Sequence, residues 1–121
     1  MSGTWNRAVA GAAMLMASTL GAQTTPAQAP TAMRLFLLIG QSNMAGRGTV
    51  EELDRTPVAH VWMLNQQGQW VPAVEPMHFD KPKVAGVGPG RAFGAAIATA
   101  TPSAEIGLIP AAVGEIGRAH V

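Results

Sequence analysis

Residues 35–48 read LFLLIGQSNMAGRG, and this stretch decides the expected fold. Its first part, residues 35–39, is apolar throughout and runs directly into Gly40. A continuous apolar run that ends at a glycine is typical of a strand buried on both faces, as in a parallel sheet. The turn after it, residues 41–43, would lie at the carboxyl end of the strand, where open α/β sheets bind ligands. We therefore expect residues 34–39 to form the first strand and the turn to carry the function.

Composition limits the other possibilities. The chain has 121 residues, enough for one small domain, and a net charge of +1. A charge this small gives no support for nucleic acid or an anionic membrane surface as a partner. The sequence contains no cysteine, which excludes disulfide bonds, cysteine zinc sites and thiol catalysis within it. The 14 glycines and 9 prolines favour a loop-rich α/β domain over a helix bundle.

Residues 1–22 have the features of a secretory signal peptide. One basic side chain, Arg7, precedes a run of apolar and small residues at 8–20, which is too short to cross a bilayer as a helix. Cleavage after Ala22 would leave a linker rich in Pro, Ala, Gln and Thr, residues 23–32, which we expect to be disordered. The prediction is a secreted or periplasmic protein that meets the membrane only for export. The alternative is an uncleaved anchor or a buried helix.

The rest of the chain alternates between strand, turn and helix patterns. Strands are expected at residues 58–64 and 106–112, with a turn at 65–68, a short returning strand at 69–71, a loop at 74–83 and a glycine-rich loop at 84–90. An alanine-rich helix packed closely on the sheet is expected at residues 91–101, before Pro102. This order predicts an α/β fold with a parallel sheet and right-handed crossovers.

The turn after the first strand contains Ser42, a candidate nucleophile. A serine hydroxyl needs a base that takes its proton and donors that stabilise the oxyanion. Gly40 allows a sharp turn, so the N–H groups of Ser42 and Asn43 would point outward, as at a helix N-terminus. The glycine loop at residues 86–90 would offer a second N–H donor, while Pro89 argues against a phosphate cradle. The alternatives are an N-cap or turn role for Ser42 and a plain helix entry for the glycine loop.

Three blocks of the sequence carry a family resemblance. Residues 40–46, GQSNMAG, resemble the nucleophile block of the SGNH hydrolases, and more narrowly of the branch with sialate O-acetylesterases and carbohydrate esterase family 6 acetylxylan esterases. Residues 86–94 resemble its second block, which carries an oxyanion glycine, and residues 106–114 resemble the strand that follows. The blocks occur in the right order and cover nearly all of residues 33–114.

The resemblance implies a flavodoxin-like three-layer α/β/α fold and ester hydrolysis through an acyl-enzyme. The expected substrate is an acetylated carbohydrate, and no metal or cofactor is expected. Ser42 would be the nucleophile and would place its own N–H in the oxyanion hole, with the N–H of Gly88 or Gly90 as the second donor. Three further residues of the motif are expected to shape the loop: Gly40, Gln41 and Asn43.

The sequence also departs from that branch. A Gln-Gly-Glu block and a late Asp-x-x-His block, which supplies the base and its orienting carboxylate, are absent. The three histidines present are poor substitutes as a proton acceptor for Ser42. His60 is expected within a strand, His78 lies in a loop beside Asp80, and His120 is the penultimate residue. We expect the chain as given to be inactive.

The last residues, 115–121, read EIGRAHV, which is also the translation of a common sequencing adapter. We therefore expect residues 33–114 to be the N-terminal part of an SGNH-type esterase domain and residues 115–121 to be a non-native tail. In that case Arg118 and His120 carry no function. The alternative is a natural, divergent C-terminus. An incomplete sheet would expose an unpaired edge and apolar faces, so we expect aggregation.

Two groups of residues allow both a functional and a structural interpretation. Glu51, Glu52 and Asp54 could act as acid and base, but an exposed turn is favoured because no pattern buries them. Trp62 and Trp70 could stack on sugars, but packing in or beside the core is favoured.

Two other classes of function remain. One is a catalytically silent carbohydrate-binding or degenerate domain that keeps the serine loop for its shape. The other is a different serine ester hydrolase of the same fold, such as a lipase or thioesterase. The motif continuation at residues 44–48 favours the carbohydrate branch but does not fix the acyl group.

A new read of the gene from its source, past codon 114, tests the expected tail. We expect the frame to continue into a Gln-Gly-Glu block and a late Asp-x-x-His block. A genomic frame that ends at Val121 would contradict this expectation and would favour the carbohydrate-binding alternative.

Overall fold

The computed structural model describes residues 28–114. The expected leader at 1–22, the start of the expected linker at 23–32 and the expected tail at 115–121 lie outside this range. The elements in chain order are β1 (Arg34–Leu38), α1 (Ser42–Ala45), the short 3-10 helix η1 (Leu53–Arg55), β2 (Val61–Leu64), β3 (Trp70–Pro72), α2 (Gly90–Ala100) and β4 (Ile106–Pro110). None of the helices within 28–114 is long and apolar enough to cross a membrane.

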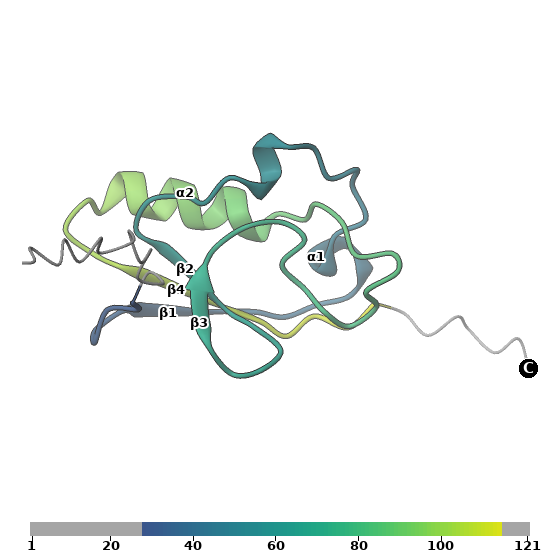
Figure 1. Cartoon of the computed structure of the whole chain (residues 1–121), viewed down its shortest axis with the longest axis horizontal. Helices are drawn as coiled ribbons and strands as arrows, with labels where there is room; N and C mark the ends of the chain where they lie inside the picture. Colours follow the sequence, from purple (N-terminus) through teal and green to yellow (C-terminus); the bar gives the residue numbers. More distant parts are fainter. Residues whose placement is uncertain (1–27, 115–121) are drawn as a thin grey trace, which may run out of the picture.

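The strands form one four-stranded sheet in the order β1-β4-β2-β3. β1 and β2 both run parallel to β4, and β3 pairs antiparallel with β2 (Figure 1). The expected mixed α/β content, the parallel strands and the hairpin over residues 65–71 are therefore confirmed. The order differs from a flavodoxin-like order, in which the first strand lies between the second and third parallel strands. Here the last strand, β4, takes the middle place.

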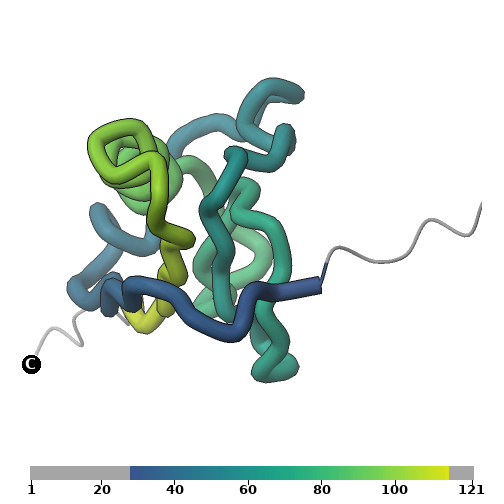
Figure 2. The backbone as a smooth tube through the Cα atoms, turned by 90° about the vertical axis from the view of Figure 1, so that its left-hand side faces the viewer, coloured from purple at the N-terminus to yellow at the C-terminus, as the bar shows by residue number. Residues whose placement is uncertain are grey.

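Helix α2 covers one face of this sheet, as Figures 1 and 2 show. It can lie close to the strands because Gly94 has no side chain. A methyl group at that position would lie 2.8 Å from Val61 Cγ1 and 2.9 Å from Leu108 Cδ1. The helix ends at Thr101, whose N–H and hydroxyl both donate to the Ile97 carbonyl, and Pro102 follows. The prediction of a helix packed closely on the sheet is confirmed.

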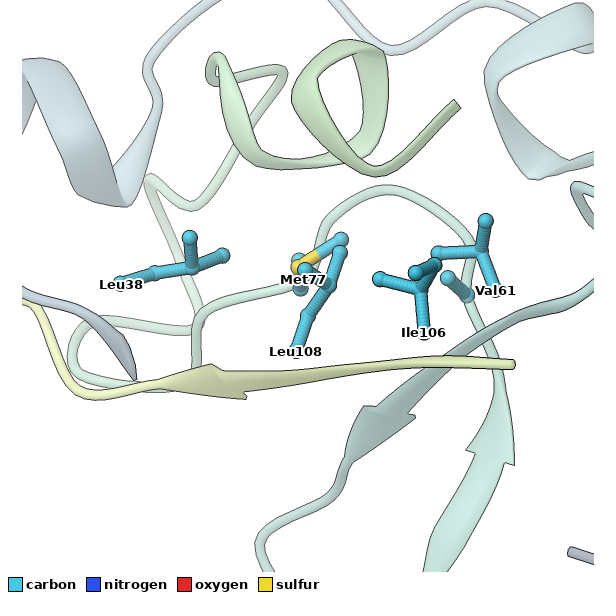
Figure 3. Close-up of a cluster of buried hydrophobic side chains, with 6 residues drawn as sticks. Leu38, Val61, Met77, Ile106 and Leu108 are labelled. Atoms are coloured by element: carbon cyan, nitrogen blue, oxygen red, sulfur yellow. The ribbon is translucent and has the colours of Figure 1, made fainter. Parts of the chain in front are cut away.

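The hydrophobic core lies between α2 and the sheet (Figure 3). Its buried side chains come from all three parallel strands and from the loop before α2: Leu38, Val61, Ala73, Met77, Ile106 and Leu108. β4 is the most deeply buried strand, because it has a neighbour on each edge and the helix above it. Phe36 of β1 extends the core toward Phe93 of α2, with ring centroids 5.2 Å apart in an edge-to-face arrangement.

The expectation that the first strand is buried on both faces is wrong for the described chain. β1 is an edge strand, and Leu35 and Leu37 are each 57% exposed. Their side chains share the face opposite α2 with their register partners Gly107 and Ile109 on β4. No helix within residues 28–114 covers that face (Figure 1). An unbroken apolar run indicates that a strand is stabilised by burial, but it does not show which strands and helices lie beside it.

The second strand is also shorter than expected, since β2 begins at Val61. Ala59 and His60 form a turn before it, and His60 has a left-handed backbone with φ of 64°. The expectation that His60 lies within a strand is therefore wrong. Apolar residues lie on both sides of His60, so the run at 58–64 resembles one continuous strand and gives no signal for this turn.

The exposed apolar face generates a prediction about solubility. Replacing Leu35 and Leu37 together by lysine should raise the soluble fraction of the expressed chain, because two charges interrupt a contiguous apolar patch. Leu53→Lys is the control, since Leu53 is 72% exposed but lies apart on η1. An equal gain from the control would show that added charge, and not this face, governs solubility.

Candidate functional site

The serine loop, residues 40–48, begins where β1 ends. Gly40 has φ of 146°, Gln41 is extended, and a tight helical turn starts at Ser42. The Gln41 carbonyl accepts the N–H groups of Met44 and Ala45, and the Ser42 carbonyl accepts the N–H of Gly46. Within the described residues, the N–H groups of Ser42 and Asn43 and the Ser42 hydroxyl have no hydrogen-bond partner. Ser42 is half-buried and its donors are available.

The serine loop lies directly against the glycine loop, residues 86–90. Gly48 and Val87 exchange two backbone hydrogen bonds, of 3.1 and 2.9 Å, and the Gly86 N–H donates to the Gly46 carbonyl at 3.1 Å. A methyl group at Gly46 would overlap the Gly86 carbonyl, and one at Gly88 would lie 2.7 Å from the Met44 carbonyl oxygen. The glycines thus allow the two loops to approach each other. From the sequence alone, they were expected to allow close approach of a substrate.

The end of β4 joins the same edge of the site. The N–H of Ala111 donates to the Leu38 carbonyl, and the N–H of Val113 donates to the Gly40 carbonyl. These contacts continue the pairing of β1 and β4 beyond the strands themselves. As a result, the carboxyl ends of both strands meet at the turn that carries Ser42.

Asp80 links three segments of this edge through one carboxylate oxygen. Asp80 Oδ2 accepts the N–H of Gly114 at 2.6 Å and lies 3.3 Å from Arg47 Nη2. Arg47 Nη1 donates to the Gly46 carbonyl at 2.7 Å. Burial alone would raise the pKa of the Asp80 carboxyl, but the Gly114 and Lys81 N–H groups and the Arg47 guanidinium hold it below its ordinary value.

Glu75 is a buried carboxylate that the sequence reading missed. It is 3% exposed, its Oε2 accepts the Met77 N–H at 3.1 Å, and its own N–H donates to the Asp54 carbonyl. Burial raises the pKa of the Glu75 carboxyl, while the N–H groups of Met77, Gly88 and Arg91 act in the opposite direction. The acid therefore lies behind the glycine loop and the start of α2. A lone glutamate beside a proline in a loop gives no sequence signal for such a position.

None of the histidines in the described range is hydrogen-bonded to Ser42. His78 is 4% exposed and neither ring nitrogen has a partner, so it does not form the base-and-orienter pair with Asp80. Burial lowers the pKa of the His78 imidazole, Arg47 adds to this effect, and Asp80 opposes it. His60 Nδ1 instead lies 2.7 Å from Glu105 Oε1, just before β2 and β4 begin. The described residues therefore contain no base in contact with the candidate nucleophile.

The other candidate side chains have structural surroundings. Glu51 and Glu52 are exposed, and the half-buried Asp54 accepts the Glu51 N–H at 2.9 Å, as expected for a turn. Trp62 and Trp70 are both half-buried, as expected. The Trp62 indole N–H donates to Glu105 Oε2 at 3.0 Å. Residues 28–114 contain no cluster of three or more side chains suited to hold a metal ion.

An apolar pocket of about 300 Å³ opens beside the serine loop, between β1 and the start of α2. Its lining is Phe36, Leu37, Leu38, Met44, Pro89, Gly90 and Phe93. Met44 belongs to the turn that Ser42 begins, and Gly90 is one of the two candidate oxyanion donors. The serine loop and the glycine loop therefore both contribute to the wall of this apolar pocket.

The contact between the loops generates a matched pair of glycine variants. Gly46 and Gly68 both have a positive φ, of 87° and 75°, but nothing lies within 4 Å of a methyl group at Gly68. Gly68→Ala should cost about 1 kcal/mol for the backbone alone. Gly46→Ala should cost more and should speed hydrogen exchange of the Gly48 and Val87 amides, because the methyl group forces the loops apart. Equal exchange in both variants would contradict this account of the contact.

Comparisons with known proteins agree with this architecture. The family model for carbohydrate esterase, sialic acid-specific acetylesterase, matches residues 32–117. The chain is 39% identical over 99 residues to a probable carbohydrate esterase of Arabidopsis thaliana, over 67% of this chain and 38% of that protein. The X-ray structure of the same Arabidopsis thaliana protein is similar at 39% identity and a TM-score of 0.58, over 66% of this chain and 41% of the crystallised chain. The chain thus spans less than half the length of this relative, and it belongs to the carbohydrate esterase family of the sialic acid-specific acetylesterase type.

Proposed function

We propose that the gene product is a serine esterase that removes acetyl groups from a carbohydrate, with Ser42 as the nucleophile. The observation that carries the proposal is the state of Ser42. It lies at the carboxyl end of β1, its hydroxyl and N–H have no partner among the described residues, and the glycine loop is hydrogen-bonded beside it. Family membership supports the same reaction class.

The chemistry follows from this arrangement. The Ser42 oxygen attacks the ester carbonyl carbon while a base takes its proton, and the carbonyl electrons move onto the oxygen. The N–H of Ser42 and that of Gly88 or Gly90 stabilise this oxyanion, and the Gly88 N–H would have to turn from the Glu75 carboxylate to do so. Collapse of the intermediate breaks the bond to the sugar oxygen, which leaves as an alcohol with the proton from the base. Water then cleaves the acetyl-serine, releases acetate and restores the hydroxyl. Gly40, Gln41 and Asn43 shape the loop, and no metal or cofactor takes part.

The base belongs to a part of the protein outside residues 28–114. We propose that residues 33–114 are the N-terminal part of a longer esterase domain of the three-layer SGNH type, and that residues 115–121 are a non-native tail. The length of the matched relative supports a longer domain, since the chain covers 38% of that protein and 41% of its crystallised chain. The acetyl ester is proposed to be on sialic acid or xylan. Residues 1–22 direct export to a secreted or periplasmic location, and residues 23–32 form a linker.

A second candidate is a catalytically silent carbohydrate-binding domain. One specific observation favours it: no histidine or carboxylate of the described residues is hydrogen-bonded to Ser42. This candidate predicts affinity for the sugar without turnover.

The test uses the complete gene product, the variant Ser42→Ala and a panel of esters. Acetylated sialic acid and acetylated xylan should be hydrolysed, and longer-chain aryl esters should react poorly. Ser42→Ala should lose at least about 1,000-fold in kcat, since removal of a nucleophile leaves only binding and oxyanion stabilisation. A fluorophosphonate should label the wild type and not the variant. Sugar binding without labelling or turnover would sink the esterase proposal and support the silent domain.

A further inference from the structure

We propose that Asp80 is a positioning residue for Ser42, and that it acts through Arg47 on the carbonyl of Gly46. This inference rests on the proposed function and deepens it. It assigns to a loop carboxylate, far from Ser42 in the sequence, the task of fixing the turn that presents the nucleophile and its N–H.

The first step is the contact between Asp80 and Arg47. The Asp80 side chain is 4% exposed and the Arg47 side chain is 30% exposed, so the pair is sheltered on the carboxylate side. Asp80 Oδ2 holds Arg47 Nη2 at 3.3 Å and the Gly114 N–H at 2.6 Å. A methyl group at Gly114 would overlap the Arg47 guanidinium, so the guanidinium can take this position only beside a glycine. The carboxylate therefore fixes the guanidinium against the chain that leaves β4.

The second step leads from Arg47 to the serine turn. Arg47 Nη1 donates to the Gly46 carbonyl at 2.7 Å, and the Gly86 N–H donates to the same oxygen. The Gly46 N–H in turn donates to the Ser42 carbonyl at 2.9 Å and closes the turn. Both sides of Gly46 are thus fixed, one by the arginine and the glycine loop, the other by Ser42 itself. A shift at Gly46 therefore moves the Ser42 carbonyl, and with it the turn that holds the Ser42 side chain and N–H.

The arrangement needs the two ends of a guanidinium. Nη1 reaches the Gly46 carbonyl while Nη2 reaches Asp80, so one planar group spans two acceptors. A lysine ammonium is a single point charge and cannot span them in the same way. The contact matters for the position of the serine turn more than for the stability of the fold. Misplacement of a reacting group by about 1 Å can cost about 100-fold in rate.

The experiment compares Asp80→Asn, Arg47→Lys and Arg47→Met in the complete gene product. All three should lower kcat for an acetylated sugar by about tenfold or more, with KM within about twofold, because the turn and not substrate binding is disturbed. The double variant Asp80→Asn with Arg47→Met should be no worse than Arg47→Met alone, since both act along one path. Wild-type kcat in Asp80→Asn and Arg47→Lys, with Ser42→Ala inactive, would overturn the inference and leave the esterase proposal standing.

Glu105→Gln is the matched control. Glu105 accepts two hydrogen bonds, as Asp80 does, but both come from side chains, His60 and Trp62, and it lies at the opposite end of β4. Its amide variant should lose stability but keep kcat. An equal loss of kcat in Glu105→Gln would show that replacing any hydrogen-bonded carboxylate of the fold by an amide slows the enzyme. That result would overturn the positioning role of Asp80.

A second readout does not depend on activity. Asp80→Asn should speed hydrogen exchange of the Gly46 amide, which closes the serine turn, and should leave the Thr101 amide at the end of α2 unchanged. If the wild type neither hydrolyses esters nor reacts with a fluorophosphonate, the proposed function fails, and this exchange still decides whether Asp80 holds the turn. Unchanged exchange at Gly46 would overturn the inference.

Discussion

The close contact between two loop backbones is the constraint on which the rest of the site depends. Gly46 and Gly48 lie against Gly86 and Val87, where three main-chain hydrogen bonds replace side-chain packing. Each loop follows or precedes an element of the α/β core, so the contact connects the end of β1 to the start of α2. Without it, the turn that carries Ser42 would keep only its own hydrogen bonds, the Arg47 contacts and the bond from Val113 to Gly40.

Much of the fold could be predicted, because the signals were local. The alanine-rich helix before Pro102, the hairpin after β2 and the buried strand at 106–110 all have patterns that extend over their own length. The burial of β1 could not be predicted, because it depends on which strands and helices lie beside it. His60 shows a second limit, since one residue with a left-handed backbone interrupts a pattern that otherwise reads as a strand.

The candidate site divides in the same way. Ser42, the serine loop and the glycine loop could be found in the sequence, because the residues of each motif lie within a few positions of each other. The contact of Asp80 with Arg47 joins residues 33 positions apart, and only the folded chain brings them together. Glu75 is buried behind the glycine loop for the same reason. Pairwise contacts across loops are set by topology, and a single sequence does not display them.

The main-chain character of the contact between the loops has a consequence for the diversity of this family. Hydrogen bonds between peptide groups do not depend on the identity of neighbouring side chains, provided that the glycines remain. A position such as Val87 can therefore accept new side chains while the spacing of the two loops stays the same. A protein built in this way can change the surface around Ser42 by substitution and keep one unaltered backbone frame beneath it.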